Sequence, residues 1–297
     1  MNLPSWYNQY KNFIEESIDR YLRSYLAIPM SDPLERFKEI IIYSVRWGKK
    51  LRATLALEFY LSLTWKNLKE VKYEDDITKL CIALEIMHAF SLIHDDLPCM
   101  DNDELRRWEL TVWKKYSEYE AVLVWDMMNS LTFELISDIK NPKDSRAIAK
   151  LISHSVWFYW MVWGQVEDLY FENHIWDLDR DTLTGLHAKK TWKLIEASII
   201  SWCILSWETA NIDIYWNLWK KLGLAFQVKD DILDVEWTPE ETGKSVGWEK
   251  KWFVYLVWLT ASKKILDDEI DDCKKISQSL GSNKIDFLVD FVAKRVR

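Results

Sequence analysis

The stretch His88-Ala89-Phe90-Ser91-Leu92-Ile93-His94-Asp95-Asp96-Leu97-Pro98-Cys99-Met100-Asp101 is an apolar helical run that leads into three aspartates. A counterpart lies far downstream, Phe226-Gln227-Val228-Lys229-Asp230-Asp231-Ile232-Leu233-Asp234. An unpaired buried carboxylate is costly, and neighbouring carboxylates repel each other. Two solvated acidic helix ends would explain either run alone. Two matched sets instead predict hard cations, because Mg²⁺ is usually held by a few carboxylates together with substrate phosphates.

The composition of the chain excludes several classes of protein. Its 297 residues are 49% hydrophobic and 29% charged, with a net charge of −8, which is typical of a globular protein and leaves no basic stripe for a nucleic acid. The polar N-terminus is not that of a signal peptide, and the most apolar runs, 156–163 and 199–207, are too short to span a bilayer. Widely spaced cysteines predict reduced thiols in a cytoplasmic protein: Cys81, Cys99, Cys203 and Cys273.

Apolar residues recur at helical spacing through most of the chain, and no convincing alternating strand is present. Pro98 lies inside the first acidic motif, so the helix that carries Asp95 should stop or kink there. The pattern predicts a single all-α domain, residues 1–297, of ten or more helices. Besides the helix that begins near Ile77, helices are expected over residues 5–26, 33–46, 50–64, 118–137, 144–163, 193–206, 213–235, 249–275 and 284–295.

Charged side chains fall into groups that could bind a diphosphate. Asp230 and Asp234 are four residues apart and share a helix face, and His88 looks along the face that ends in the first acidic set. A histidine on an apolar face can equally be an ordinary core residue, and each basic group can be a solvated charge. Together, metal ions on the acidic side and cations on the other would complement a diphosphate. The basic groups are Gly48-Lys49-Lys50-Leu51-Arg52, Arg106-Arg107, Lys189-Lys190-Thr191, and Lys244 with Lys250.

The chain has these motifs in the same order as the trans-polyprenyl diphosphate synthases, and it resembles in particular the bacterial enzymes of the farnesyl or geranylgeranyl type. The resemblance runs from about Tyr43 to about residue 260 and includes Gly164-Gln165-Val166-Glu167-Asp168. It implies an isoprenoid-synthase bundle around a deep apolar cavity. It also implies a homodimer and a reaction between isopentenyl diphosphate and an allylic diphosphate, dimethylallyl or geranyl. The expected product is farnesyl diphosphate, with geranylgeranyl diphosphate as the alternative.

The resemblance assigns roles by position. Three Mg²⁺ ions per site would be bound by Asp95, Asp96, Asp101, Asp230, Asp231 and Asp234. The allylic diphosphate would be contacted by Arg106, Lys190, Thr191, Gln227, Lys244 and Lys250. Isopentenyl diphosphate would be held by Lys49, Arg52, His88 and Arg107. The catalytic set among these is Asp95, Asp96, Arg106, Lys190 and Asp230.

Product length should depend on what closes the bottom of the cavity. Phe90 lies five residues before Asp95, roughly 7.5 Å along a helix, and an aromatic residue there acts as a floor in similar short-chain enzymes. Ser91 beside it belongs to the same chain-length group. The competing interpretation of Phe90 is ordinary core packing. The extra residues Pro98 and Cys99 in the first motif are also of the bacterial short-chain type.

The tryptophans depart from the family pattern. The chain has 19 Trp but only 7 Gly, whereas about 21 Gly are typical of this length. Indoles at glycine positions should overpack the cavity or strain turns. We therefore hypothesise that UGA codons read as glycine in the source have been translated as tryptophan, while Trp113 is genuine. If the letters are literal, activity is in doubt. The suspect positions are Trp47, Trp108, Trp125, Trp163, Trp192 and Trp258.

Two other functions are consistent with parts of the pattern. A terpene cyclase shares the fold class and the first acidic motif, but it needs neither the second Asp-Asp-x-x-Asp nor the Lys49, Arg52 and His88 group. A non-catalytic partner subunit of a prenyl synthase would lose acidic motifs, and both motifs are intact here.

Overall fold

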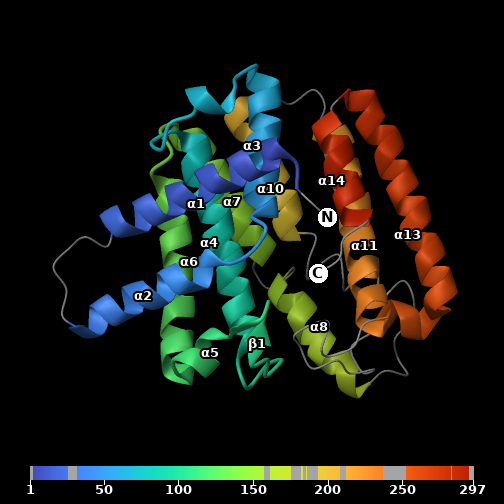
Figure 1. The fold of residues 1–297 in the computed structure, drawn as a ribbon, viewed down its shortest axis with the longest axis horizontal. Helices are drawn as coiled ribbons and strands as arrows, with labels where there is room; N and C mark the ends of the chain where they lie inside the picture. The colour runs from blue at the N-terminus through green and yellow to red at the C-terminus, as the bar shows by residue number, and fades with distance from the viewer. Residues whose placement is uncertain are drawn as a thin grey trace. The chain divides into compact units, whose positions relative to one another are not determined.

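The computed structural model describes residues 3–25, 32–156, 161–174, 182, 185, 193–207, 212–236, 252–281 and 283–293. The chain divides into two compact units, each with its own packing. The N-terminal unit comprises residues 2–149 with 204–207, and the C-terminal unit comprises 150–203 with 208–297. Almost all of the described elements are helices (Figure 1), so the prediction of an all-α fold is confirmed.

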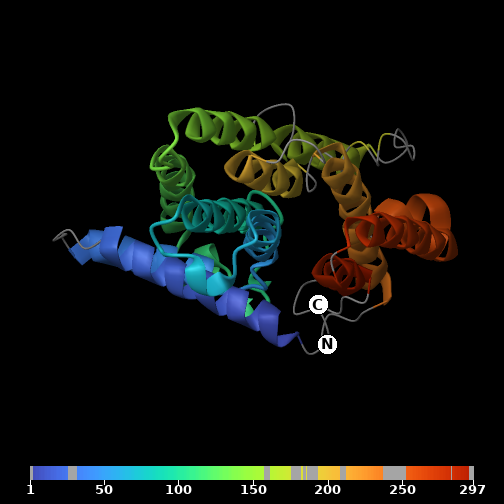
Figure 2. The same ribbon diagram turned by 90° about the horizontal axis from the view of Figure 1, so that it is seen from above.

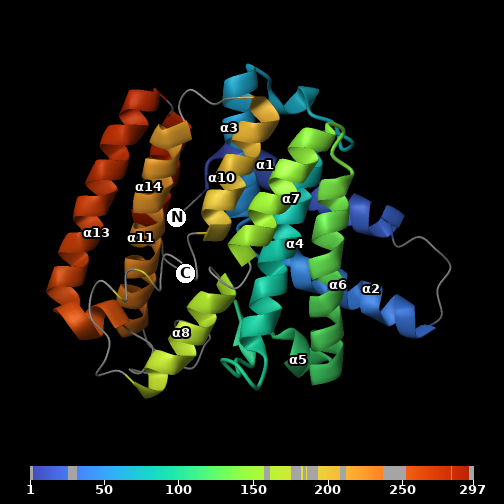
Figure 3. The same cartoon turned by 180° about the vertical axis from the view of Figure 1, so that it is seen from behind.

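The N-terminal unit is built around α4, Asp76–Asp96, which contacts α1, α2, α3, α5 and α6. The views from front and back show α4 running between α3 and α6 (Figures 1 and 3). The surrounding elements are α1 (Ser5–Tyr25), α2 (Asp32–Arg46), α3 (Leu51–Thr64), the 3₁₀ turn η1 (Leu68–Glu70), α5 (Val112–Lys115) and α6 (Glu118–Ser137). Helix α7 (Pro142–Val156) begins in this unit.

The sequence of α4 explains its central position. Its apolar residues lie on every side of the helix rather than on one stripe, as expected for a helix with neighbours all round. Ile77, Leu80, Leu84 and Met87 are each at most 1% exposed. By length and composition α4 is the one described helix that could cross a membrane, but 72% of its most apolar window is buried inside the structure, as in the core helix of a globular protein.

The C-terminal unit contains a group of three packed helices, α11 (Ile212–Glu236), α13 (Trp252–Leu280) and α14 (Asn283–Ala293). They lie side by side in two perpendicular views (Figures 1 and 2). Lys221 on α11 joins α13 through Glu269 and Asp272, at 3.2 and 2.9 Å. The unit also contains α8 (Met161–Asn173) and most of α10 (Lys193–Ser206).

The predicted boundaries agree with the structure at most ends, although α13 continues to Leu280, beyond the expected end at 275, and α5 and η1 were not expected. Helix α4 ends at Asp96, two residues before Pro98, as predicted. Of the expected helix over 144–163, the structure describes α7 up to Val156 and α8 from Met161, and residues 157–160 lie outside the described part of the chain. The remainder of α8 and the short antiparallel hairpin of β1 (Leu105–Arg106) and β2 (Glu109–Leu110) were not predicted.

Candidate active site

The first acidic motif folds back on the end of α4. Proline at position 98 prevents the helix from continuing, and Leu97 turns to an extended conformation with ψ 149°. The backbone N–H of Asp101 then donates to the carbonyl of Asp95, at 2.9 Å. The extra residues between the aspartates therefore form a tight turn that returns Asp101 to the helix end.

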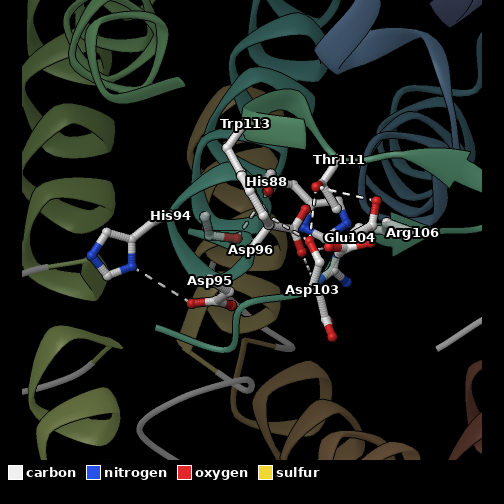
Figure 4. Close-up of polar contacts among 10 residues, drawn as sticks. His88, His94, Asp95, Asp96, Asp103, Glu104, Arg106, Thr111 and Trp113 are labelled. Carbon is white, nitrogen blue, oxygen red and sulfur yellow. Dashed lines mark hydrogen bonds and ion pairs between the residues drawn. The ribbon is translucent and has the colours of Figure 1, made fainter. Parts of the chain in front are cut away.

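Asp96 and Arg106 form the closest ion pair of this region. The Asp96 side chain is only 6% exposed, and its Oδ1 accepts from Nη2 and Nε of Arg106 at 2.5 and 2.7 Å (Figure 4). Asp103 lies 3.6 Å from the same guanidinium, whereas Asp95 pairs with His94 at 3.6 Å. Burial alone would lower the pKa of Arg106, but the surrounding aspartates raise it above its ordinary value. Arg106 therefore stays charged and neutralises part of the acidic motif.

The hairpin β1–β2 positions the two arginines. Its strands pair Arg106 with Glu109, which leaves Arg107 and Trp108 as a two-residue turn. The Asp103 carbonyl at the base of the hairpin accepts from the Thr111 hydroxyl at 2.8 Å and from the Trp113 indole at 2.9 Å (Figure 4). These bonds fix the hairpin beside the end of α4.

Gly48 makes room for Arg107. Gly48 has φ 115°, a conformation that L side chains rarely adopt. A Cβ at this position would overlap with Nη1 of Arg107. The guanidinium therefore lies directly against the backbone that precedes α3, which explains why a glycine stands here.

Positive charges gather around His88. Within the described residues, Nδ1 of His88 and Nε of Arg52 are buried without a hydrogen-bond partner. Burial and the charges of Arg52, Arg107, Lys50 and Arg106 lower the pKa of His88 well below 6.5. Burial likewise lowers the pKa of Arg52, to about 10, so this side chain is still charged at neutral pH. Donors of this kind, short of acceptors, are what a polyanion would satisfy.

Glu85 partly balances these cations. It is 5% exposed on α4, and its Oε1 accepts from the backbone N–H of Ala53 in the first turn of α3, at 3.2 Å. Its negative charge raises the pKa of Arg52 and of Lys50 against the effect of burial. The first turn of α3, which follows the basic group predicted to bind a diphosphate, thus already has a carboxylate on one of its backbone amides. Glu85 was not predicted, although a carboxylate three residues before His88 on an apolar helix was a usable signal.

The two adjacent lysines of the basic motif have different environments. Lys50 is 3% exposed in a left-handed conformation, and its Nζ donates to the carbonyls of Val45 and Trp47 at 2.5 and 3.0 Å. It therefore holds the carbonyl end of α2. The carbonyl of Lys49 accepts from the Tyr7 hydroxyl at 2.8 Å, while its side chain is only half-buried. Of the two, Lys49 has the side chain that could reach a ligand.

A hollow lies beside the two arginines. It is open on one side, and its space, with the adjoining solvent included, is about 430 Å³. Its wall includes the charged side chains of Arg106, Arg107, Asp96 and Glu109, and apolar side chains such as Leu92 and Ile93. The hollow therefore offers charged groups of both signs together with apolar side chains, as sites for small ligands often do.

The predicted chain-length residues, Phe90 and Ser91, are not among the residues that line this hollow. Phe90 is 9% exposed and stacks on Trp125 of α6, with ring centroids 5.7 Å apart. The same indole lies 4.8 Å from His94. The hydroxyl of Ser91 donates to the carbonyl of His88 at 2.9 Å, within the helix. Phe90 therefore packs between α4 and α6, and its role as a floor stays a prediction.

The second acidic motif lies on α11 in the C-terminal unit. Asp231 is 3% exposed, whereas Gln227 and Asp230 are partly exposed. Gln165 on α8 is buried. Several predicted site residues lie outside the described part of the chain: Lys190, Thr191, Lys244, Lys250, and the side chain of Asp234.

The carboxylates suit Mg²⁺ in their chemistry, since all are hard oxygen donors. Among the described residues, no three acidic, histidine or cysteine side chains converge as a ready-made metal site. Mg²⁺ usually takes part of its coordination from substrate phosphates. Asp95 and Asp96 would offer two of the ligands from the end of α4.

Comparison with known proteins identifies relatives. A family model described as polyprenyl synthetase matches residues 34–272. The farnesyl diphosphate synthase of Micrococcus luteus is 36% identical over 88% of this chain and 89% of its own length. The geranylgeranyl diphosphate synthase of Cyanophora paradoxa is 32% identical over 84% and 80%. The structure of a Helicobacter pylori geranyltransferase, complexed with magnesium and isoprenyl diphosphate, superposes with a TM-score of 0.78 at 28% identity, covering 98% of this chain and 97% of that one.

Replacing Gly48 by alanine should displace Arg107. The new Cβ would overlap with the guanidinium, and we expect the affinity for inorganic pyrophosphate to fall about tenfold or more, the value of one charged hydrogen bond. Titration calorimetry measures it. Gly281→Ala is the matched control, because Gly281 also has a positive φ, 68°, but a Cβ added there would meet no other atom within 4 Å. Equal losses in the two variants would refute the role given to Gly48.

His88 should make the unliganded protein less stable in acid. Its pKa is far below 6.5 in the folded state and near 6.5 in the unfolded chain, so the unfolded chain binds more protons below that pH. The free energy of unfolding should therefore decrease as the pH falls below 6.5, by up to about 1.4 kcal/mol per pH unit. Urea unfolding at a series of pH values measures this slope. His88→Gln should flatten it, whereas His154→Gln, which replaces an exposed histidine, should not.

Proposed function

The chain belongs to the polyprenyl synthetase family, and we propose on that premise that it condenses isopentenyl diphosphate with dimethylallyl or geranyl diphosphate. The product is farnesyl diphosphate, and inorganic diphosphate is released. The observation that carries this proposal is the group of positive charges around His88, with unsatisfied buried donors, next to the acidic end of α4. A protein of this fold with no diphosphate to bind would have no use for it.

Isopentenyl diphosphate would be bound by Lys49, Arg52, His88 and Arg107. The buried Nε of Arg52 and Nδ1 of His88 would each gain an acceptor from the diphosphate. Neutral His88 would donate one hydrogen bond without adding charge. The gain comes from relieving two buried unsatisfied groups, which are destabilising as long as the ligand is absent.

The allylic diphosphate would have Arg106, Lys190, Thr191, Gln227, Lys244 and Lys250 as its protein contacts. The six aspartates would hold the magnesium ions, three per site. Magnesium, when bound, would stabilise the charge that develops on the leaving diphosphate. Arg106 would turn from Asp96 toward that diphosphate, and Asp96 would thereby be released to bind metal.

The reaction needs no protein nucleophile. The allylic carbon–oxygen bond breaks, the double bond of isopentenyl diphosphate forms the new carbon–carbon bond, and a proton is then lost. Apolar residues such as Leu92 and Ile93 would keep water from the allylic cation. The charged side chains would hold both substrates in the orientation for attack.

The remaining assignments extend this proposal. We expect a cytoplasmic homodimer in which residues 1–297 act as one synthase domain. Geranylgeranyl diphosphate is the alternative product, which the relative from Cyanophora paradoxa supports. A terpene cyclase would have no use for the cations around His88, and a non-catalytic partner subunit would be inactive on its own.

Purified protein should convert dimethylallyl diphosphate and labelled isopentenyl diphosphate to a fifteen-carbon product with Mg²⁺ and not with chelator. Asp95→Asn should lower kcat about 10²–10³-fold, as expected for a lost electrostatic contact in the transition state. Asp268→Asn replaces an exposed aspartate of α13 and should have no effect. Product formation without isopentenyl diphosphate would indicate a cyclase, and no turnover in any condition would indicate a partner subunit.

Phe90→Ala should lengthen the product if Phe90 is the floor. Removing the ring opens space between α4 and the Trp125 indole, so the growing chain can extend further. Chromatography of the dephosphorylated products measures their length. Phe287→Ala, which removes a ring from α14, controls for general destabilisation. An unchanged fifteen-carbon product from Phe90→Ala would leave ordinary core packing as the role of Phe90.

A further inference from the structure

Four tryptophans have a backbone conformation that a bulky residue rarely adopts. The φ angles are 56° at Trp65, 70° at Trp108, 61° at Trp207 and 66° at Trp258. Among described residues other than glycine, the only others with positive φ are Lys50, Asn102 and Arg107. Asparagine tolerates this region through its short polar side chain, but for an indole it is unfavourable. More than half of these exceptions are thus one residue type.

Trp65 and Trp207 lie where helices end. The N–H of Trp65 donates to the carbonyl of Leu61, and so does the N–H of Lys66, at 3.1 Å. This bond from Lys66 is the 6→1 bond of a Schellman motif, whose left-handed residue is usually glycine. Trp207 directly follows α10 and donates to the carbonyl of Ile204 at 3.3 Å. Both residues therefore stand where helix-terminating glycines are found.

Trp108 occupies the glycine position of a hairpin turn. The two-residue loop of β1–β2 consists of Arg107, with φ 56°, and Trp108, with φ 70°. Two positive φ values in succession are those of a type I′ turn, for which Asn-Gly is the preferred pair. Trp108 is the second residue of this pair, in the hairpin that carries both site arginines.

Trp258 lies at a kink within α13, with φ 66° and ψ 154°. This combination is far from the left-handed helical region. It belongs to a part of backbone space that is essentially restricted to glycine. A glycine would allow the kink without strain, and the carbonyl of residue 258 would still accept from Ser262, at 3.1 Å.

The four indoles are largely exposed, so they bury little surface that could offset this strain. They are 94%, 63%, 75% and 79% exposed, in chain order. Trp202, by contrast, is fully buried in α10 against Tyr215, with ring centroids 5.0 Å apart, and Trp113 donates to the carbonyl of Asp103. Trp113 and Trp202 therefore use their indoles, whereas the four tryptophans with positive φ have a backbone that disfavours one.

We infer that the natural protein carries glycine at positions 65, 108, 207 and 258, because its source reads as glycine a codon that is translated here as tryptophan. The shortage of glycine and the excess of tryptophan, 7 against 19, have the same explanation. Backbone geometry adds positions 65 and 207 to those where the sequence suggested glycine. It also supports glycine at positions 108 and 258, which the sequence had already suggested. Trp47, Trp125 and Trp163 do not have positive φ, and Trp192 lies outside the described residues. Glycine at these positions is expected whether or not the proposed function is correct.

Peptide mass spectrometry of the protein from its native source tests this directly. The expected result is glycine at all four positions, encoded by UGA, and tryptophan at 113 and 202, encoded by UGG. Tryptophan at the four positions would overturn the inference.

Stability measurements on the protein with the sequence as written provide a second test. Replacing each of the four tryptophans by glycine should raise the melting temperature, by about 2 °C or more per position, because a positive φ costs glycine nothing. Alanine at the same positions also removes the indole but keeps the Cβ, so it should give a smaller rise. Trp202→Gly should lower the melting temperature. Alanine matching or exceeding glycine at all four positions would count against a glycine backbone.

Discussion

The ion pair between Asp96 and Arg106 is the interaction on which the described site depends. Both groups are largely buried, and a buried charge without its partner is strongly destabilising. The pair joins the end of α4 to the hairpin, so the hairpin can present Arg107 to the backbone at Gly48. Glu85 plays the corresponding part on the other side of His88, where it opposes the charges of Arg52 and Lys50. The site is thus a balance of buried charges, with donors left over for a ligand.

Much of the fold and part of the site could be predicted from the sequence. Helices with long apolar periodicity, such as α4 and α11, were predicted close to their observed extents, and Pro98 marked the end of α4. The hairpin was not predicted, because each strand has only two residues and no alternation can show in so short a segment. The register of the hairpin depends on its turn. A glycine at position 108 would have indicated this turn, but the sequence has Trp there.

The basic motif shows the limit of counting charges. The sequence predicts a cation-rich helix start at Gly48-Lys49-Lys50-Leu51-Arg52. It does not indicate that Lys50 binds the carbonyl end of α2 while Nε of Arg52 is left without a hydrogen-bond partner. That difference follows from the left-handed conformation of Lys50, a property of the chain path rather than of the side chain. Glu85 was overlooked for a related reason: its partner, the N–H of Ala53, comes from a different helix and is invisible to local patterns.

The enclosure of α4 has a consequence for how this protein can change. Because α4 has helices on nearly all sides, few of its positions can vary without repacking a neighbour. The helix that bears His88, Asp95 and Asp96 is therefore the least adjustable part of the N-terminal unit. Substitutions that reshape the surroundings of α4 should be tolerated more readily on facing helices such as α6. The chemistry would then be inherited nearly unchanged while the space around it diversifies.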